Sequence, residues 1–119
     1  MLPKKTRIPR SLFKNAIIGT RFVNSSYFTL RYKILSAREQ TGGKNTKKRF
    51  AFVIPKTAAK KAVVRNKIRR RGYGIIRKNL SNIKEGAICI FLAKKGVAGL
   101  NFDDLEKEIV GLLKKAYLL

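Results

Sequence analysis

The sequence of 119 residues contains no histidine, no tryptophan and only one cysteine. Without histidine, the chain lacks the usual general base, the usual partner of an activated nucleophile and the commonest metal ligand. A single cysteine excludes a disulfide within the chain and leaves no cysteine cluster for a metal. We therefore expect no catalytic residue, no metal site and no bound cofactor in the protein itself.

Acidic residues are also scarce: six Asp and Glu stand against 29 Lys and Arg, which gives a net charge of +23. Four of the six acids lie after residue 100, so the first hundred residues carry 26 bases against two acids. Such a chain repels itself unless a polyanion neutralises it, and neutralising phosphates releases condensed counterions. Nucleic acid is therefore the expected partner, with binding that weakens as salt rises.

Long apolar segments are missing as well. No run of about 18 apolar residues could span a membrane, and no amphipathic helix pairs a lysine face with a Trp- or Leu-rich face. The basic start MLPKKTRIPRSLF lacks the apolar stretch of a signal peptide. We therefore expect a cytoplasmic protein without a membrane partner.

Hydrophobic residues make up 45% of the chain, which is enough for one modest core and predicts a single domain over residues 1–119. Apolar periodicity predicts six elements joined by short connections and one basic loop at 38–48. The predicted helices are about 10–18, 57–80 and 102–117, and the predicted strands are 27–35, 49–54 and 87–93. The expected fold is α+β: a two-layer sandwich in which helices pack on a small mixed sheet with a β-α-β unit.

Several aromatic residues lie among basic ones and have two interpretations, as stacking platforms for unpaired bases or as core residues. These residues are Phe22, Tyr27, Phe28, Tyr32, Phe50 and Phe52. The core interpretation is favoured for Phe28, Phe50 and Phe52, whereas both stay open for Tyr27, whose strand face also carries Arg31. Cys89, in an apolar run, is expected to be an inert core residue. The adjacent Asp103 and Asp104 are expected to stabilise a helix start rather than to form a catalytic pair.

The segment KKAVVRNKIRRRGYGIIRKNL, residues 60–80, separates into two faces when placed on a helix. The apolar face is predicted to hold Val64, Ile68, Ile75 and Ile76. The polar face is predicted to hold Asn66, Arg69, Arg70, Tyr73 and Arg77. Arginine forks grip phosphate oxygens and stack on bases, and an asparagine amide can bind a sugar or a base edge. A merely solvated face is the alternative, but solvated faces mix both signs, and no acid occurs between Glu39 and Glu85.

The stretch RFAFVIPKTAAKKAVVRNKIRRR, residues 49–71, resembles the signature region of the protein subunit of bacterial ribonuclease P. That signature joins a strand, a lysine-rich turn and a helix that opens with an Arg-Asn-Arg motif. Arg65 and Asn66 match the first two positions, Lys67 stands in for the second arginine, and Arg69 and Arg70 match the following basic pair. Weaker similarity covers nearly the whole chain.

The resemblance implies a left-handed β-α-β crossover, a helix that contacts the catalytic RNA, and a cleft that receives the single-stranded 5′ leader of precursor tRNA. Residues expected to bind the catalytic RNA are Lys56, Lys60, Lys61, Arg65, Asn66, Lys67, Arg69, Arg70, Tyr73 and Arg77. Residues expected to bind the leader are Phe13, Ile17, Tyr27 and Arg31. Three of these depart from the family pattern: Ile17 replaces an aromatic residue, Arg31 a tyrosine and Tyr73 an arginine.

The implied function is assistance to RNA-catalysed removal of the 5′ leader, with Mg²⁺ held by the RNA subunit. The expected partners are the ribonuclease P RNA and precursor tRNA, with no obligate protein partner. A structural ribosomal protein is the first alternative, and the strand-turn-helix signature argues against it. A DNA-binding module is the second, but the sequence shows no helix-turn-helix pairing and no zinc-ligand spacing.

Overall fold

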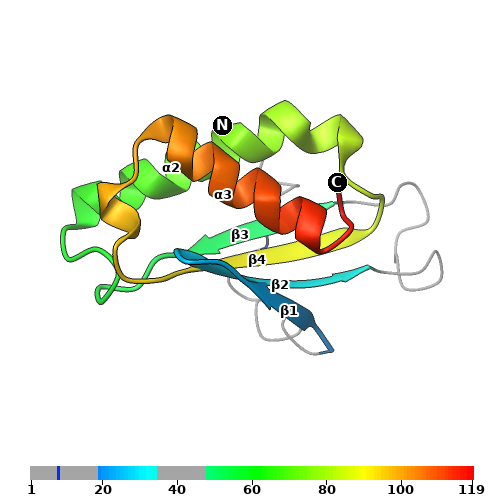
Figure 1. Ribbon diagram of the computed structural model, residues 1–119, viewed down its shortest axis with the longest axis horizontal. Coiled ribbons are helices and arrows are strands. Elements are labelled where there is room, and N and C mark those ends of the chain that lie inside the picture. Colours follow the sequence, from blue (N-terminus) through cyan, green and yellow to red (C-terminus); the bar gives the residue numbers. More distant parts are fainter. Residues whose placement is uncertain (1–7, 9–18, 35–47) are drawn as a thin grey trace.

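The computed structural model describes residue 8, residues 19–34 and residues 48–119. Within these ranges, four strands form one sheet, and two helices cover one of its faces (Figure 1). The strands are β1 (Arg21–Asn24), β2 (Phe28–Ile34), β3 (Arg49–Val53) and β4 (Ala87–Ala93). The helices are α2 (Ala62–Asn79) and α3 (Phe102–Lys115), and the 3-10 turns are η3 (Leu80–Asn82) and η4 (Val97–Gly99). The predicted α+β sandwich is confirmed.

The sheet has the strand order β1-β2-β4-β3 and is mixed. β2 runs antiparallel to β1 and to β4, whereas β3 and β4 are parallel and joined through α2. The predicted mixed sheet and β-α-β unit are therefore confirmed, and the left hand of the crossover stays a prediction. The sequence pattern missed β1, which spans only four residues. The predicted helix at 10–18, together with Phe13 and Ile17, lies outside the described residues, as does the predicted loop up to residue 47.

The predicted helix at 57–80 begins later than expected, at Ala62. The backbone N–H groups of Ala58 and Ala59 both donate to the Pro55 carbonyl oxygen, at 2.9 and 3.1 Å. These bonds form a tight turn over residues 55–61, with both alanines buried. Lys61 then has an extended backbone, at φ −85° and ψ 132°, and the helix starts after it. The turn replaces the first helical turn because Pro55 ends the strand and its carbonyl accepts both bonds.

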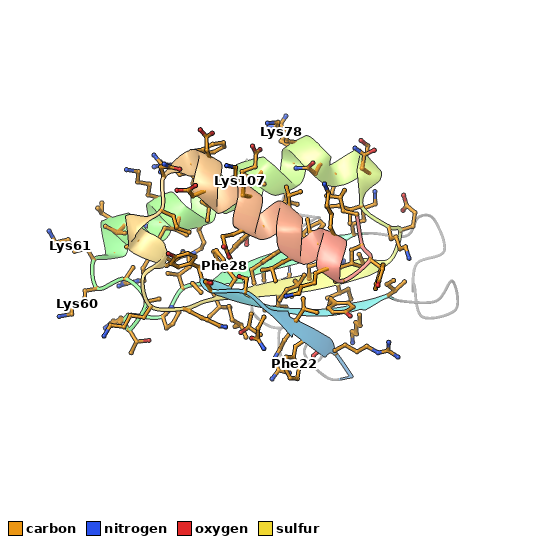
Figure 2. The ribbon with its side chains drawn as sticks, in the orientation of Figure 1. Phe22, Phe28, Lys60, Lys61, Lys78 and Lys107 are labelled. Carbon is orange, nitrogen blue, oxygen red and sulfur yellow. The ribbon has the colours of Figure 1, made fainter. Side chains whose placement is uncertain are left out.

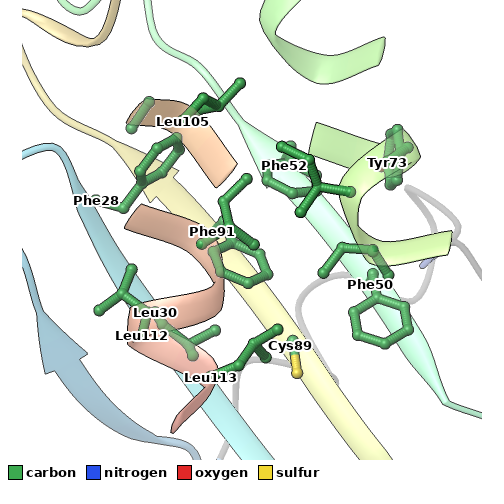
Figure 3. Packing of buried hydrophobic residues seen from close by; sticks show 14 of the residues in the cluster. Phe28, Leu30, Phe50, Phe52, Tyr73, Cys89, Phe91, Leu105, Leu112 and Leu113 are labelled. Atoms are coloured by element: carbon green, nitrogen blue, oxygen red, sulfur yellow. The ribbon is translucent and has the colours of Figure 1, made fainter. Parts of the chain in front are cut away.

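The core lies between the sheet and the two helices, and phenylalanine rings fill its centre (Figure 3). The Phe52 ring on β3 stacks on the Phe91 ring on β4, with centroids 4.7 Å apart and planes at 9°. Phe28 on β2 meets both rings edge-on. The predicted core residue Cys89 is fully buried, and burial raises the pKa of its thiol above the ordinary value. Four residues from three strands thus form one continuous apolar surface beneath the helices.

Gly72 allows α2 to approach β3 closely. A Cβ atom at this position would lie 2.7 Å from two atoms of the Phe52 ring. Gly74 is different, since a Cβ there would meet nothing within 4 Å. Gly72 is therefore explained by packing against the sheet, and packing does not explain Gly74.

This difference makes the two glycines a matched pair for a stability test. We expect Gly74→Ala to raise the free energy of unfolding by up to about 1 kcal/mol, because alanine is the better helix former. We expect Gly72→Ala to lower it by about 1–3 kcal/mol, because the added methyl overpacks the core against Phe52. Urea unfolding followed by circular dichroism measures both changes. Equal stabilities for the two variants would contradict the close contact at Gly72.

Candidate nucleic-acid interface

Basic side chains line the turn at 55–61 and the outward side of α2. We call basic surface the exposed set Lys56, Lys60, Lys61, Asn66, Lys67, Arg70 and Arg77. Lys60 and Lys61 project from the end of the molecule where α2 begins (Figure 2). The first turn of α2 has no acidic residue, and no side chain caps its start. The N-terminal end of the helix dipole therefore adds to the positive potential of these lysines.

The opposite side of α2 faces the core, as the sequence predicted. Ile68, Ile75 and Ile76 are buried, and Val64 packs against the same cluster. Because these side chains fix which side of the helix faces inward, the cations opposite them must face solvent. Arg69 and Arg71 lie between the two sides and are half-buried.

Arg65 is bound within the protein. Its Nη1 atom donates to the carbonyl oxygens of Ala59, at 2.9 Å, and Lys60, at 2.7 Å. One terminal guanidinium nitrogen carries two N–H groups, so Nη1 alone bridges the two carbonyl oxygens. Arg65 therefore fastens the turn at 55–61 to the start of α2 and so orients the lysines on that turn. Sequence patterns do not predict this role, because it depends on the turn.

Tyr73 corrects the prediction for the polar face. Its side chain is only 8% exposed, and its ring meets the Phe52 ring edge-on with centroids 5.1 Å apart. The close approach at Gly72 brings the next residue of the helix over Phe52, so the tyrosine packs into the core. The prediction that Tyr73 lies on the exposed polar face of the helix is therefore wrong.

A second basic region lies on the face of the sheet away from α2 and α3. Side chains alternate along a strand, so the partners of Arg31 lie on that face with it. We call this the outer sheet face, and its described residues are Phe22, Asn24, Thr29, Arg31, Lys33, Arg49, Ala51, Val53, Ile88, Ile90 and Leu92. The Arg31 guanidinium carbon lies 6.0 Å from the centroid of the Phe22 ring. Its Nη1 atom donates to Thr20 Oγ1 at 3.4 Å.

Tyr27 does not share that face, contrary to the sequence-based assignment. It precedes β2 and packs, half-buried, against the core cluster. A Cβ atom at Gly96 would lie 3.2 Å from its ring, so the ring also lies beside this glycine. Of the four residues expected to bind the leader, the structure therefore places only Arg31 on the outer sheet face, since Phe13 and Ile17 are not described.

Two acidic residues of α3, Glu106 and Glu108, form contacts with other elements. The Ser25 hydroxyl donates to Glu108 Oε2 on α3 at 2.5 Å, and Glu106 pairs with Lys78 of α2 at 3.0 Å. Two lysines donate to carbonyl oxygens of the β1–β2 turn. Lys94 Nζ donates to the Ser25 carbonyl at 2.8 Å, and Lys115 Nζ donates to the Asn24 carbonyl at 3.3 Å. The turn between β1 and β2 is therefore fixed to α3 and to the end of β4.

Within the described ranges, no helix has the length and apolar character needed to cross a membrane.

Comparison with known proteins identifies the family. The family model described as Ribonuclease P matches residues 2–117. The chain belongs to the ribonuclease P protein family. A ribonuclease P protein component from Syntrophomonas wolfei is 28% identical over 118 residues, covering 99% of this chain and 92% of the relative. One from Rickettsia canadensis is 42% identical over 65 residues, covering 52% of this chain and 55% of the relative.

Solved structures of the family share the fold. The Staphylococcus aureus RNase P protein superimposes with a TM-score of 0.79 at 19% identity, covering 97% of this chain and 98% of that one. The Thermotoga maritima RNase P protein gives a TM-score of 0.73 at 21% identity, covering 92% and 96%. The α+β fold expected from the strand-turn-helix signature is thus confirmed, with the hand of the crossover still a prediction.

The two bonds of Arg65 can be tested by substitution. We expect Arg65→Lys to loosen the turn at 55–61, because the lysine side chain is one bond shorter and its ammonium falls short of the two carbonyl oxygens that Arg65 Nη1 reaches. The amide protons of Ala58 and Ala59 should then exchange faster with solvent, as measured by NMR hydrogen exchange. Arg70→Lys is the matched control, because Arg70 is exposed on the same helix. Equal exchange in both variants would contradict the fastening role.

Proposed function

We propose that this chain is the protein subunit of a ribonuclease P ribonucleoprotein and assists RNA-catalysed removal of the 5′ leader from precursor tRNA in the cytoplasm. The observation that carries the proposal is the basic surface, on which the described helix α2 presents Asn66, Lys67, Arg70 and Arg77 to solvent. Membership of the ribonuclease P family supports the choice of catalytic RNA as the partner of this surface.

The protein's contribution is electrostatic in this proposal. Two RNA molecules repel each other through their phosphates, and each cation that binds a phosphate removes part of that repulsion. Arginine and lysine side chains on a helix held by its apolar side need little reorganisation to meet the phosphate backbone. The positive end of the α2 dipole strengthens the same field at Lys60 and Lys61.

The proposal assigns the hydrolysis to the RNA. In the described part of the chain, no three His, Cys, Asp or Glu side chains come together as metal ligands, so a Mg²⁺ ion held by these residues alone does not fit. We therefore place Mg²⁺ on the RNA subunit and derive no step through it. The buried Cys89 thiol, with its raised pKa, is unsuited to act as a nucleophile.

The outer sheet face is proposed to bind the leader. Its described charged residues are Arg31, Lys33 and Arg49, all cationic. It lies on the opposite side of the sheet from α2, so leader and catalytic RNA would occupy separate surfaces. Binding of the leader in addition to the mature tRNA would raise the affinity for precursor over product.

Reconstitution tests the function. The chain is mixed with a bacterial ribonuclease P RNA at low Mg²⁺ concentration, and precursor-tRNA cleavage is compared with that by RNA alone. We expect faster cleavage with the protein, because its charge replaces part of the cation requirement. No gain with cognate RNA would overturn the proposal, and a structural ribosomal protein is expected to give that result.

The basic surface has its own test in a pair of exposed helical lysines. We expect Lys67→Ala to weaken binding to the ribonuclease P RNA and to reduce the slope of log K against log salt by about 1, as for one lost phosphate contact. Lys107→Ala, which removes an exposed lysine from α3, should leave the slope unchanged. Filter binding over a range of salt concentrations measures both. A smaller slope for Lys107→Ala than for Lys67→Ala would contradict the assignment to α2 and place the interface on α3.

A further inference from the structure

An exposed aromatic ring ends one row of the outer sheet face. The strand pairing sets Phe22, Arg31, Ile90 and Ala51 side by side across β1, β2, β4 and β3. Ile90 is 0% exposed and Ala51 7%, whereas Phe22 is 60% exposed. Phe22 lies on the side of the sheet away from the helices (Figure 2). The ring therefore stands at the open edge of a row whose other end is buried.

The ring has a cation as its direct neighbour. Residues directly opposite in an antiparallel pair lie within side-chain reach of each other, and the Arg31 guanidinium carbon is 6.0 Å from the Phe22 ring centroid. This distance is at the limit for a cation–π contact, which favours one orientation of the ring. Arg31 also bonds to Thr20, so both partners have restricted positions. An aromatic ring and a guanidinium group are the side-chain groups on which nucleic-acid bases stack.

The hairpin that carries the ring is fixed to the rest of the protein. Ser25, in its turn, bonds to Glu108 on α3, and the Ser25 carbonyl accepts a bond from Lys94. Across the two strands, Thr29 Oγ1 donates to Asn24 Oδ1 at 2.6 Å. A ring held on such a hairpin loses little conformational freedom when a ligand stacks on it.

We propose that Phe22, with Arg31 beside it, is a stacking platform for an unpaired RNA base. The inference rests on the proposed function and specifies the leader contact: the base lies on the exposed face of the Phe22 ring, and a neighbouring phosphate faces Arg31 or Lys33. A single exposed phenylalanine needs no explanation by itself. Here the ring stands on a rigid hairpin, against a cation, on a face whose described charged residues are all basic.

The charge selects RNA over an apolar protein partner. A protein surface complementary to Arg31, Lys33 and Arg49 would need acidic groups around an apolar pocket, whereas a nucleotide supplies a flat ring and a negative charge in one unit. Single-stranded RNA is selected over a duplex because paired bases are stacked on each other and do not offer their faces. Stacking on phenylalanine tolerates any base, so we expect little dependence on leader sequence.

The first experiment measures substrate affinity of the reconstituted holoenzyme. We expect Phe22→Ala to weaken binding of precursor tRNA by about tenfold, in the range of one lost base–aromatic stack. Binding of tRNA without a leader should not change, and Phe22→Trp should retain leader affinity. Phe102→Ala is the control, because Phe102 is also an exposed phenylalanine but lies at the start of α3.

The second experiment uses the absence of tryptophan from the sequence. In Phe22→Trp the introduced indole is the only one, and a base stacked on it should quench its fluorescence. We expect quenching by a single-stranded oligoribonucleotide and much less by duplex RNA of the same sequence. Phe102→Trp should show no such difference.

The outcomes separate this inference from the proposed function. If the wild-type protein gives no gain in cleavage, both are overturned. If it does and Phe22→Ala binds leader-bearing and leaderless tRNA like wild type, only the stacking platform is overturned, and an apolar protein partner becomes the better assignment. Equal losses for both tRNAs, or equal quenching by single-stranded and duplex RNA, also overturn the platform.

Discussion

The contact between the Gly72 backbone and the Phe52 ring determines how near α2 lies to the sheet. Because Phe52 also stacks on Phe91, the helix is seated on a pair of rings that joins the parallel strands β3 and β4. Tyr73 then closes over the edge of Phe52. Holding α2 by this side leaves its cations facing solvent, so the geometry of the basic surface follows from an apolar contact. The electrostatics of the protein depend on the packing beneath them.

The distribution of the acids serves the same arrangement. A chain with a net charge of +23 gains most from its few carboxylates where they join elements. Glu108 binds the β1–β2 turn, Glu106 pairs with Lys78 between α3 and α2, and Glu85 lies 3.5 Å from Lys48 before β3. The Lys78–Glu106 pair is exposed and therefore weak on its own. Together, however, these contacts keep the acids away from the basic surface and the outer sheet face. Two cationic surfaces therefore lie on different sides of one small sheet, as the proposed contact with two RNA molecules requires.

Sequence patterns predicted the elements whose burial has a simple period. β2 alternates, β4 is almost wholly apolar and α3 has one apolar stripe, so their predicted ranges lie within two residues of the observed ones. The predicted start of α2 was wrong because two bonds to the Pro55 carbonyl compete with the first helical turn. The predicted exposure of Tyr73 was wrong because its burial depends on how closely the helix approaches β3 at Gly72. The pairing of Phe22 with Arg31 was equally out of reach, since strand register is a tertiary property.

The exposures along α2 also define the shape of the basic surface. At about 100° per residue, Asn66, Arg70 and Arg77 fall within a narrow arc opposite Ile68, with Lys67 at its border. The half-buried Arg69 and Arg71 lie between this arc and the core, whereas Arg65 reaches the carbonyls of the turn at 55–61. A stripe from Asn66 to Arg77 is about 16 Å long at 1.5 Å per residue. Burial of Tyr73, at a position where the resemblance implies an arginine, removes a cation from beside this stripe but not from its centre. Tyrosine in place of arginine at this position therefore narrows the basic surface and leaves its direction along the helix unchanged.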